Sequence, residues 1–485
     1  MSDVAIAVLS VGALFVFVIS GVHIGFALIV TSLVGMIFIT GSVDIALNLL
    51  VATAYSGVRD YVFAVVPLFI LMGAFMTNCR AAESLFSAVN FLFKKLRGGL
   101  AIATVYANAI FAAVTGVSVA SAAVFSTIAF PQMERYGYSK RLALGSVAGS
   151  SVLGMLIPPS LLMILYGILT QVSIGAMFIA GIVPGVLLAL MYSIGIMVIG
   201  YLRPATVGVT PSAVAAPRPV AVAATSTSTG ADTTVASEAS EGEALDGGVD
   251  ELREADVHLP VGGERKELTF GAAVVGSIPI AALVLLVIGG IWGGIFSPTE
   301  ASAVGAIGAL AIAPFMGMDW RRFFNSFKQT AISTGAILFL LIAAQAYSRM
   351  LASSGLVARV GRFINGLEVS DFVIIVLFVL ILVVMGAVLD SSSIILLAVP
   401  LMYPSIQLLG VDPIWFGIVL IVAVEIGLLT PPFGMVPFAM SAVLGNRAAV
   451  DDIFIGSLPF LIIMALFLAI LIAFPVLSTW LPGLL

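Results

Sequence analysis

The sequence predicts an all-α polytopic membrane protein with about ten transmembrane helices and two re-entrant helical hairpins, arranged as an inverted repeat. Three observations predict this fold. Of the 485 residues, 61% are hydrophobic and only 9% are charged, which is too little charge to cover a water-facing surface. Two long apolar stretches are broken in the middle by polar residues. The two halves of the chain also repeat one pattern of prolines and glycines.

The apolar runs predict the spanning helices. A span needs about 20 apolar residues, and the first run is the shortest of the set. The N-terminus has no basic region or small-residue cleavage site, so we expect the first run to be a helix that stays in the membrane. The predicted spans are 4–20, 22–40, 61–79, 141–169, 176–202, 268–292, 299–317, 329–349, 412–441 and 453–479.

The two broken stretches, 99–133 and 371–405, are predicted to be hairpins that enter the membrane and return to the same side. The first is interrupted at Thr115–Ser118 and the second at Asp390–Ser393. Each stretch is long enough for two straight helices, but Lys and Arg flank both ends of the first, and basic residues mark the cytoplasmic side. We therefore expect both ends of the first hairpin in the cytoplasm and both chain termini on the periplasmic face.

Residues 204–267 separate a first membrane half, 1–203, from a second, 268–485. This segment is rich in Ala, Thr, Ser, Gly and Glu, and it holds eleven of the 25 acids of the chain, from Asp232 to Glu267. Such a composition predicts a disordered acidic linker, here on the cytoplasmic side. The linker is either a passive tether, which is the interpretation we favour, or a regulatory element.

The two halves match at one constant offset. Pro131 pairs with Pro404, and the Gly-x-x-x-Pro-Pro motif at 154–159 recurs at 427–432. At the same offset, the interruption of the first hairpin coincides with that of the second. Each half has five predicted spans and one hairpin, so an odd number of crossings inverts the second half relative to the first. The two hairpins then open to opposite faces, and their tips meet near the middle of the membrane.

The Pro-Pro pairs predict a cation site. A proline pair removes two backbone donors and leaves carbonyls free. Free carbonyls are tolerated in a membrane only where protein or water surrounds them. Free carbonyls and hydroxyls suit Na⁺, and two matching breaks opposite polar tips favour this interpretation over a simple kink. The candidate Na⁺ ligands from this pattern are Ser118, Ser150, Ser151 and Gly154 in the first half, and Asp390, Ser391, Glu425, Gly427 and Thr430 in the second.

The hairpin tips are predicted to bind an anion. Each tip presents a helix N-terminus, whose free N–H groups and positive dipole end attract negative charge. We therefore expect a substrate carboxylate between the two tips. The candidate substrate-binding residues are Thr115, Ser118, Ser121, Ser160, Ser391, Ser392 and Ser393.

Three acids and one histidine lie at predicted membrane depth. Asp390 is expected to be a cation ligand or network anchor, although capping the returning helix is the ordinary role for Asp at such a position. Glu425 either holds the second ion site or pairs within the core. Glu300 follows Ser-Pro-Thr at a helix start, so a structural role in the first turn is expected. His23 is expected to be a buried hydrogen-bonding group rather than a proton carrier.

The motifs at the tips and breaks also point to a family. The stretches concerned are 115–122, 137–140, 153–160 and 425–434, with 296–305 in addition. Together they resemble the large membrane subunit of tripartite ATP-independent periplasmic (TRAP) transporters, over nearly the whole chain apart from 204–267. The chain departs from the family pattern at His23, where proline is frequent, and in its long linker. Phe433 in the place of Ser160 leaves the two ion sites unequal.

The resemblance implies Na⁺-coupled import of a small organic anion, such as a C4-dicarboxylate, another carboxylic acid or a sialic acid, across the inner (cytoplasmic) membrane. It implies two partners: a small four-helix membrane subunit, and a soluble periplasmic binding protein that delivers the substrate. It also implies an elevator mechanism like that of the wider ion-transporter superfamily, in which the hairpins and broken helices move against a scaffold. Carried over to this chain, the resemblance implies Na⁺ sites around Ser118, Ser151, Gly154 and Pro158 in one half and Asp390, Ser391, Glu425, Thr430 and Pro431 in the other. No cofactor is expected besides Na⁺ as the coupling ion.

Other classes of protein fit the sequence less well. The main alternative is a stand-alone ion-coupled permease for di- or tricarboxylates or another anion, which needs no binding protein. An intramembrane enzyme is disfavoured because the predicted spans contain no His cluster, nucleophile–base pair or metal motif. A channel is disfavoured because two hairpins stacked tip to tip block a pore. No basic stripe indicates nucleic-acid binding.

Overall fold

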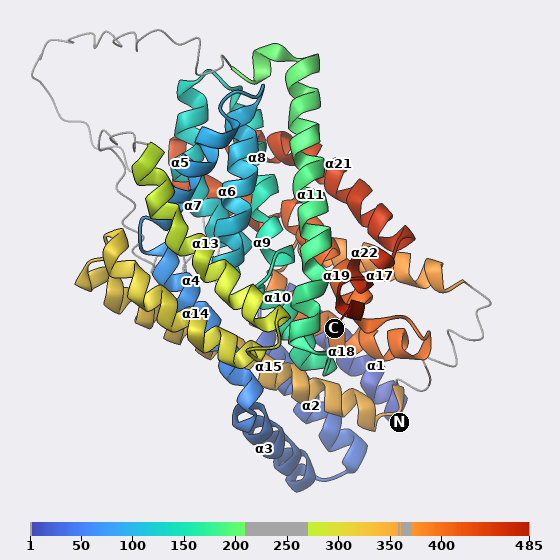
Figure 1. Ribbon diagram of the computed structural model, residues 1–485. Coiled ribbons are helices and arrows are strands. Elements are labelled where there is room, and N and C mark those ends of the chain that lie inside the picture. The colour runs from blue at the N-terminus through green and yellow to red at the C-terminus, as the bar shows by residue number, and fades with distance from the viewer. Residues whose placement is uncertain (1, 209–269, 357–358, 360–369, 485) are drawn as a thin grey trace, which may run out of the picture.

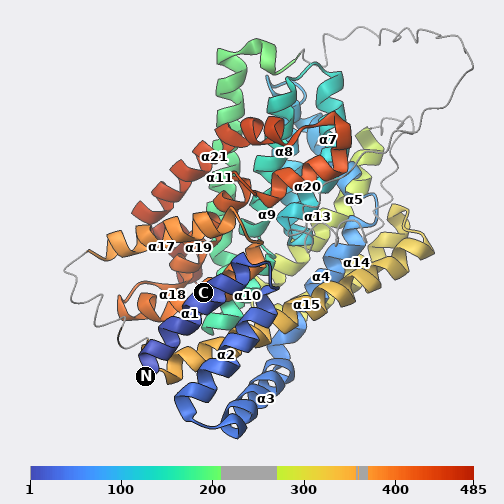
Figure 2. The same cartoon turned by 180° about the vertical axis from the view of Figure 1, so that it is seen from behind.

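The computed structural model describes residues 2–208, 270–356, 359 and 370–484. In these residues the regular elements are helices, with one isolated β-bridge between Tyr138 and Val207. The predicted all-α class is therefore confirmed. Figures 1 and 2 show long helices packed along one another, with helices of the second half lying beside helices of the first.

The first half consists of helices of 4 to 29 residues. A 3₁₀ turn, Tyr61–Ala64, leads into the fourth of them. Their bounds are α1 (Asp3–Ile19), α2 (Ile24–Thr40), α3 (Val43–Arg59), α4 (Val65–Thr77), α5 (Ala81–Phe93), α6 (Gly99–Thr115), α7 (Ser118–Arg135), α8 (Lys140–Ser151), α9 (Leu153–Leu156), α10 (Leu161–Thr170) and α11 (Ile174–Leu202).

The second half follows the same plan, with longer first and third helices. Its α15 has 34 residues, and Figure 1 shows this helix running past α2 and α14. The bounds are α13 (Phe270–Trp292), α14 (Pro298–Ile312), α15 (Trp320–Ser353), α17 (Asp371–Gly386), α18 (Ser391–Leu408), α19 (Pro413–Leu429), α20 (Met435–Leu444), α21 (Val450–Ala473) and α22 (Val476–Thr479).

Seven helices in the described ranges are long and apolar enough to cross a membrane, or up to eight if the bent pair of α3 and α4 is one span. The apolar helices α1 and α2 have only 17 residues each. Such a helix is about 26 Å long, somewhat short of a hydrocarbon core of about 30 Å. The predicted number of about ten spans includes these shorter helices and stays a prediction. The apolar pattern also missed α3, because Asp44 and Asn48 interrupt it.

Each half contains one helical hairpin, formed by two helices that contact each other across a short turn. In the first hairpin, α6 and α7 are joined at Gly116-Val117, and in the second, α17 and α18 are joined through 387–390. We call these two turns, with the first residue of the returning helix, the first and second tip. The tips lie where the sequence predicted the interruptions.

Each hairpin is followed by a broken helix. In the first half α9 ends at Leu156 and α10 begins at Leu161, and in the second α19 ends at Leu429 and α20 begins at Met435. The two interruptions, 157–160 and 430–434, are called the first and second break. Both Pro-Pro bonds are cis. The repeated order of hairpin and broken helix agrees with the predicted repeat.

Glycines bring each hairpin into close contact with its broken helix. Gly154 of α9 faces Ala112 of α6, and Gly427 of α19 faces Gly386 of α17. A Cβ atom at Gly386 would lie 2.7 Å from the Cα of Gly427, so no side chain fits between these two backbones. Gly154 and Gly427, which are candidate Na⁺ ligands, therefore have a packing role that the sequence pattern did not show.

Packed structure extends a few residues into the predicted linker. After α11 ends, the Ser139 amide donates to the Thr206 carbonyl at 2.9 Å, and Val207 is buried. Val207 lies against Gly200, where an added Cβ would be 3.3 Å from its side chain. This apolar contact explains why the chain remains packed beyond the expected boundary at 203. Residues 209–267 of the predicted linker lie outside the described residues.

Candidate transport site

The two hairpin tips meet at one buried carboxylate. Ser118 is the first residue of α7, and Ser391 is the first residue of α18. The Ser118 hydroxyl donates to Oε2 of Glu425 at 2.8 Å, and the Ser391 hydroxyl donates to Oε1 at 3.3 Å. Glu425 is only 1% exposed. The carboxylate therefore connects helix N-termini from both halves, where negative charge is favourable.

This geometry bears on the two roles left open for Glu425. A buried carboxylate is costly unless its oxygens are hydrogen-bonded. Glu425 accepts one bond at each oxygen, so the structure shows the pairing role. Each carboxylate oxygen has two lone pairs, so both retain capacity for a cation or a further donor. An ion-binding role for Glu425 stays a prediction.

The first tip packs against the first break. Gly116 ends α6 in the left-handed region with φ +67°, and a Cβ on it would lie 3.6 Å from the Leu161 nitrogen. Thr115, Pro159 and Phe69 of α4 line, with these two residues, a cavity of about 20 Å³. A single water needs roughly 10–15 Å³ of such space. The cavity is therefore large enough for one water molecule or one small ion.

The first break, whose Pro159 lines this cavity, leaves two backbone carbonyls without a helical donor. In a helix, the carbonyls of Gly154 and Met155 would accept from the amides four residues on, but those positions are Pro158 and Pro159, which have no N–H. The two prolines are buried. Backbone carbonyls at an unwound helix are ligands that transporters use for Na⁺. The carbonyl oxygens of the first break are therefore suitable ligands for a small hard cation.

The second break differs from the first in its surroundings. Pro431, Pro432 and Phe433 are exposed, with Phe433 at 42%. The Gly427 carbonyl accepts from the Thr430 amide at 2.9 Å, and the Thr430 hydroxyl donates to the Ile426 carbonyl. The breaks therefore match in sequence but not in environment. This difference agrees with the expectation that the two ion sites are unequal.

Asp390 caps the returning helix of the second hairpin. Its Oδ2 accepts from the Ser393 amide at 3.0 Å, which is the ordinary role of Asp at a helix start. Ser393 is buried and Ser392 is half-buried next to it. A capping carboxylate keeps lone pairs that accept no hydrogen bond. Cation binding by Asp390 therefore stays a prediction.

Most other candidate hydroxyls are bonded within their own helices. A hydroxyl has one hydrogen to donate, and its oxygen lone pairs remain free to contact a cation. The acceptors are the carbonyls of Ala112 for Thr115, Ser118 for Ser121, Val147 for Ser150 and Ala148 for Ser151, while Ser160 caps α10 by accepting from the Met163 amide.

Two buried polar side chains were not among the residues predicted from the sequence. Asn108 of α6 donates from Nδ2 to the Ser150 hydroxyl at 2.8 Å and to the Val147 carbonyl at 3.3 Å. Its Oδ1 has no partner in the described part of the chain, and the same holds for the hydroxyl of Tyr192 on α11. An amide within the apolar α6, two turns before Thr115, was a signal that the proline and hydroxyl patterns did not include.

Glu300 and His23 both have capping roles. Ser297 and Glu300 form a reciprocal capping box at the start of α14, in which the Ser297 amide donates to Oε2 of Glu300 at 2.8 Å. The predicted structural role of Glu300 is confirmed. His23 precedes α2 and accepts from the Gly25 amide at 3.2 Å. It is exposed, so its predicted burial is wrong; the side chain lies at the helix end rather than in the packed face.

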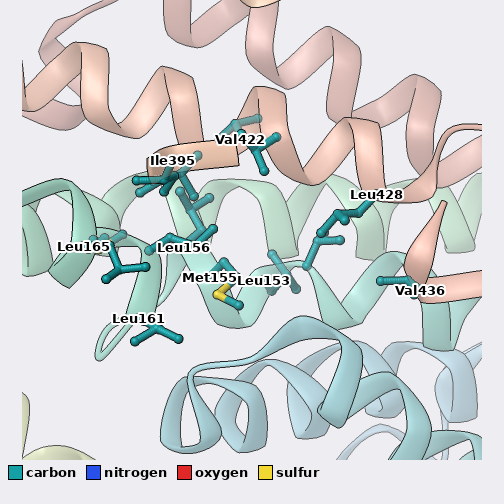
Figure 3. Close-up of a cluster of buried hydrophobic side chains, with 14 of the residues drawn as sticks. Leu153, Met155, Leu156, Leu161, Leu165, Ile395, Val422, Leu428 and Val436 are labelled. Carbon is teal, nitrogen blue, oxygen red and sulfur yellow. The ribbon is translucent and has the colours of Figure 1, made fainter. Parts of the chain in front are cut away.

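An apolar layer from both halves surrounds the polar contacts. Figure 3 shows Leu153 and Leu156 of the first half extending toward the helices that bear Ile395, Val422 and Leu428 of the second. All five side chains are nearly or fully buried. The Glu425 carboxylate is on the same helix as the last two. The contact between the tips is therefore a local polar group within an apolar interface.

These features define a class of protein. Paired hairpins and paired broken helices that bring backbone and side-chain oxygens together inside an apolar bundle are typical of secondary transporters. A family model described as the DctM component of the tripartite ATP-independent periplasmic transporter matches residues 11–477. The chain belongs to this family, whose members are the large permease subunits of TRAP transporters, as the resemblance in sequence implied.

Individual relatives agree with this assignment. The chain is 31% identical over 429 residues to the C4-dicarboxylate TRAP transporter large permease protein DctM of Pseudomonas aeruginosa, across 88% of this chain and 87% of the relative. It is 27% identical over 471 residues to the sialic acid TRAP transporter large permease protein SiaM of Vibrio cholerae, across 96% of each. The predictions of a multi-pass membrane transporter, and of a protein that is not an enzyme, are confirmed by the family.

A solved structure shares the fold. The YdaH transporter of Alcanivorax borkumensis superimposes with a TM-score of 0.57 at 14% sequence identity, over 89% of both chains. At this identity the likeness concerns the fold alone. It shows that the arrangement of helices described above occurs in a transporter of distant sequence.

Proposed function

We propose that this permease imports a small organic anion with a carboxylate group, driven by a Na⁺ gradient, across the inner (cytoplasmic) membrane. The observation that supports this most directly is the bonding of both tips to Glu425. It places two helix N-termini at one buried point, where an anionic substrate and a coupling cation can each be bound with opposite charge nearby.

Na⁺ would bind at the first break. The carbonyls of Gly154 and Met155 would supply oxygen ligands, and the cavity of about 20 Å³ that Thr115 and Pro159 line would supply space for one ion. Ser118 is within the same tip, so an ion here would influence the Glu425 contact. The second ion would bind near Asp390, Glu425 and Thr430, where the break is more open.

The substrate would be a carboxylate. The Pseudomonas aeruginosa relative is named for C4-dicarboxylates and the Vibrio cholerae relative for sialic acid, and both are carboxylic acids. The tips supply unpaired amides of helix N-termini and the hydroxyls of Ser391 to Ser393. By the same analogy, a periplasmic binding protein would deliver the anion, and a small four-helix membrane subunit would complete the transporter.

Transport would follow an elevator mechanism. α15 packs on α2, α3 and α4, and the hairpins pack on the broken helices; the two groups contact each other where α15 meets α18 and where α4 meets α6. The end of α6 meets α4 at a glycine, because a Cβ at Gly73 would lie 2.8 Å from the Thr115 carbonyl oxygen. With no side chain at Gly73 between the two backbones, one group of helices could slide past the other. The hairpins would carry the anion past α4.

The deciding experiment is uptake into proteoliposomes that contain this chain and its small subunit, with the partner binding protein outside. Labelled succinate and N-acetylneuraminate would be offered with and without an inward Na⁺ gradient. Uptake that needs both Na⁺ and the binding protein is the expected result. Uptake without the binding protein would instead mean that the chain works as a stand-alone permease. Uptake at the same rate with and without the Na⁺ gradient would exclude Na⁺ coupling.

A further inference from the structure

A second polar cavity lies away from the tips, between α10, α15 and α18. Its volume is about 220 Å³. Pro400, which lines it, is nine residues beyond Ser391 on α18, or about 14 Å along the helix axis. By the predicted orientation this cavity is at the periplasmic side. Its polar lining residues are Gln171, Gln345, Ser348, Arg349 and Tyr403.

The lining is cationic and contains no acid. Arg349 donates from Nη2 to the hydroxyl of Ser56 at 3.3 Å. Across the described ranges, Arg349 forms no ion pair with a carboxylate. A guanidinium has five N–H donors in a planar fork that matches a carboxylate. Most of these donors remain available to a ligand in the cavity.

Other polar groups line the cavity together with this charge. Ser348 and Arg349 lie three and four residues after Gln345 on α15, and all three side chains line the cavity. The ring of Tyr403 packs edge-on against Tyr166, with centroids 6.2 Å apart. Together these residues offer amide, hydroxyl and guanidinium donors to one space. Such a donor set suits an anion.

The walls of the cavity come from two different groups of helices. α15 packs on α2, α3 and α4, while α18 belongs to the second hairpin and α10 follows the first break. Figures 1 and 2 both show α15 passing next to α10 and α18. If the hairpins slide along α15, Arg349 and Tyr403 separate. An anion that contacts both walls would therefore bind to one conformation only.

We propose that this cavity binds the carboxylate group of a small organic anion on the outer side, before the anion reaches the tips. This inference rests on the proposed function for its choice of ligand. Arg349 binds the carboxylate, and the α18 wall makes binding depend on the position of the hairpins. The site is separate from the one formed by Ser118, Ser391 and Glu425.

The test uses the full chain in phosphatidylcholine nanodiscs. A Ser348→Cys reporter is placed in a Cys79→Ala background, since Cys79 is the single native cysteine and is buried. Millimolar succinate, acetate or N-acetylneuraminate is expected to slow maleimide labelling of the reporter thiol. At about ten times Kd the slowing is about tenfold, because the free fraction falls as 1/(1 + [L]/Kd). Neutral succinamide is expected to have no effect.

Variants of Arg349 test whether protection of the reporter thiol depends on the positive charge of this residue. Arg349→Gln is expected to abolish protection by all three carboxylates, and Arg349→Lys to retain part of it. Arg59→Gln is the matched control, because Arg59 is an exposed arginine at the end of α3 on the same predicted side. Protection that survives Arg349→Gln in a protein with unchanged thermal unfolding would overturn the proposal. Loss of protection in Arg59→Gln would also contradict it.

Two further arms test a lipid ligand and the link to transport. Nanodiscs with phosphatidylglycerol test whether a lipid headgroup takes the site; protection by this lipid without protection by the soluble carboxylates would overturn the proposal. Proteoliposome uptake separates this inference from the proposed function. Carboxylate uptake by the wild-type chain without any protection of the reporter thiol would refute the cavity site and leave the proposed function intact. Protection of the reporter thiol without Na⁺-driven uptake would support the cavity site and refute the proposed function.

Discussion

The Ser118 hydroxyl lies 2.8 Å from Oε2 of Glu425, and this contact joins residues 307 positions apart in the chain. Ser391 reaches the other oxygen of the same carboxylate. A change at either tip therefore alters the electrostatic environment of the other. The two tips are coupled through one side chain, in addition to the helix packing that joins the two halves.

Replacing Glu425 should impair transport strongly. Glu425→Ala removes the acceptor of two hydrogen bonds, each worth about 1.5–3 kcal/mol when the acceptor is charged. We expect the initial uptake rate to fall by at least about tenfold, since 1.4 kcal/mol corresponds to a factor of ten. Glu425→Gln retains one acceptor oxygen, so its initial uptake rate should lie between those of the wild type and the alanine variant. Initial uptake in proteoliposomes measures the effect.

A second acid serves as the control for Glu425. Glu300→Gln also removes a carboxylate from the second half, but Glu300 only closes the capping box with Ser297. We expect this variant to lose a little thermal stability and to keep its uptake. If Glu425→Gln transports as well as Glu300→Gln, the carboxylate is not part of the transport machinery.

The two tip serines should be energetically coupled. Ser118→Ala and Ser391→Ala each remove one bond to Glu425, and the shorter contact of Ser118 predicts the larger loss of stability. In a double-mutant cycle, groups that share a network show coupling of about 0.5–3 kcal/mol. Denaturant or thermal unfolding of the purified variants gives this value.

Ser121 provides the matched control for the cycle. It is a buried serine of the same helix, but its hydroxyl donates to the Ser118 carbonyl within α7. Ser121→Ala combined with Ser391→Ala should be additive. Additive behaviour of Ser118→Ala with Ser391→Ala would mean that Glu425 does not link the tips.

The local breaks in structure were predictable because they are set by the residue types themselves. Proline lacks an N–H and glycine tolerates a positive φ, so the ends of α6, α9 and α19 follow from local sequence. The contact of Ser118 with Glu425 was not predictable, since it depends on packing between distant segments. Asn108 was missed for a related reason: one amide in an apolar helix shows its importance only when the carbonyl and hydroxyl that it bonds are known.

The crossing of α17 and α19 should not tolerate a side chain. A Cβ at Gly427 would meet the backbone of Gly386 and would lie 2.7 Å from the Val383 carbonyl oxygen. Gly427→Ala must therefore push the two helices apart, at a cost of about 1–3 kcal/mol, as in other overpacked interiors. Thermal unfolding of the detergent-solubilised protein measures the loss.

A glycine in open space is the control for this crossing. Gly335 lies in α15, and nothing is within 4 Å of the position that its Cβ would take. Gly335→Ala should raise stability by about 0.5–1 kcal/mol, because alanine is the better helix former. Equal stability of the Gly427 and Gly335 variants would show that α17 and α19 are not in close contact.

The elevator proposal predicts that joining α4 to the first tip stops transport. Ile70 of α4 and Val117 of the tip line the same small cavity, so cysteines at these positions in a Cys79→Ala background should react with one short bifunctional thiol reagent. Crosslinked protein is expected to lose uptake, because the link fixes the first tip to α4 and also enters the cavity proposed for Na⁺. Uptake should return when a cleavable crosslink is reduced.

A crosslink within the hairpin-bearing group separates this effect from a general loss of activity. Lys140 of α8 and Asp452 of α21 form an exposed ion pair at 3.1 Å, and α8 packs along α21. Lys140→Cys with Asp452→Cys, treated with the same reagent, should keep its uptake, because α21 packs on α8 and on the broken helix of α19 and α20 and would move with the hairpins in the proposed mechanism. If the protein joined at Ile70 and Val117 still transports at the wild-type rate, the first tip does not slide past α4 and the elevator mechanism is wrong for this protein.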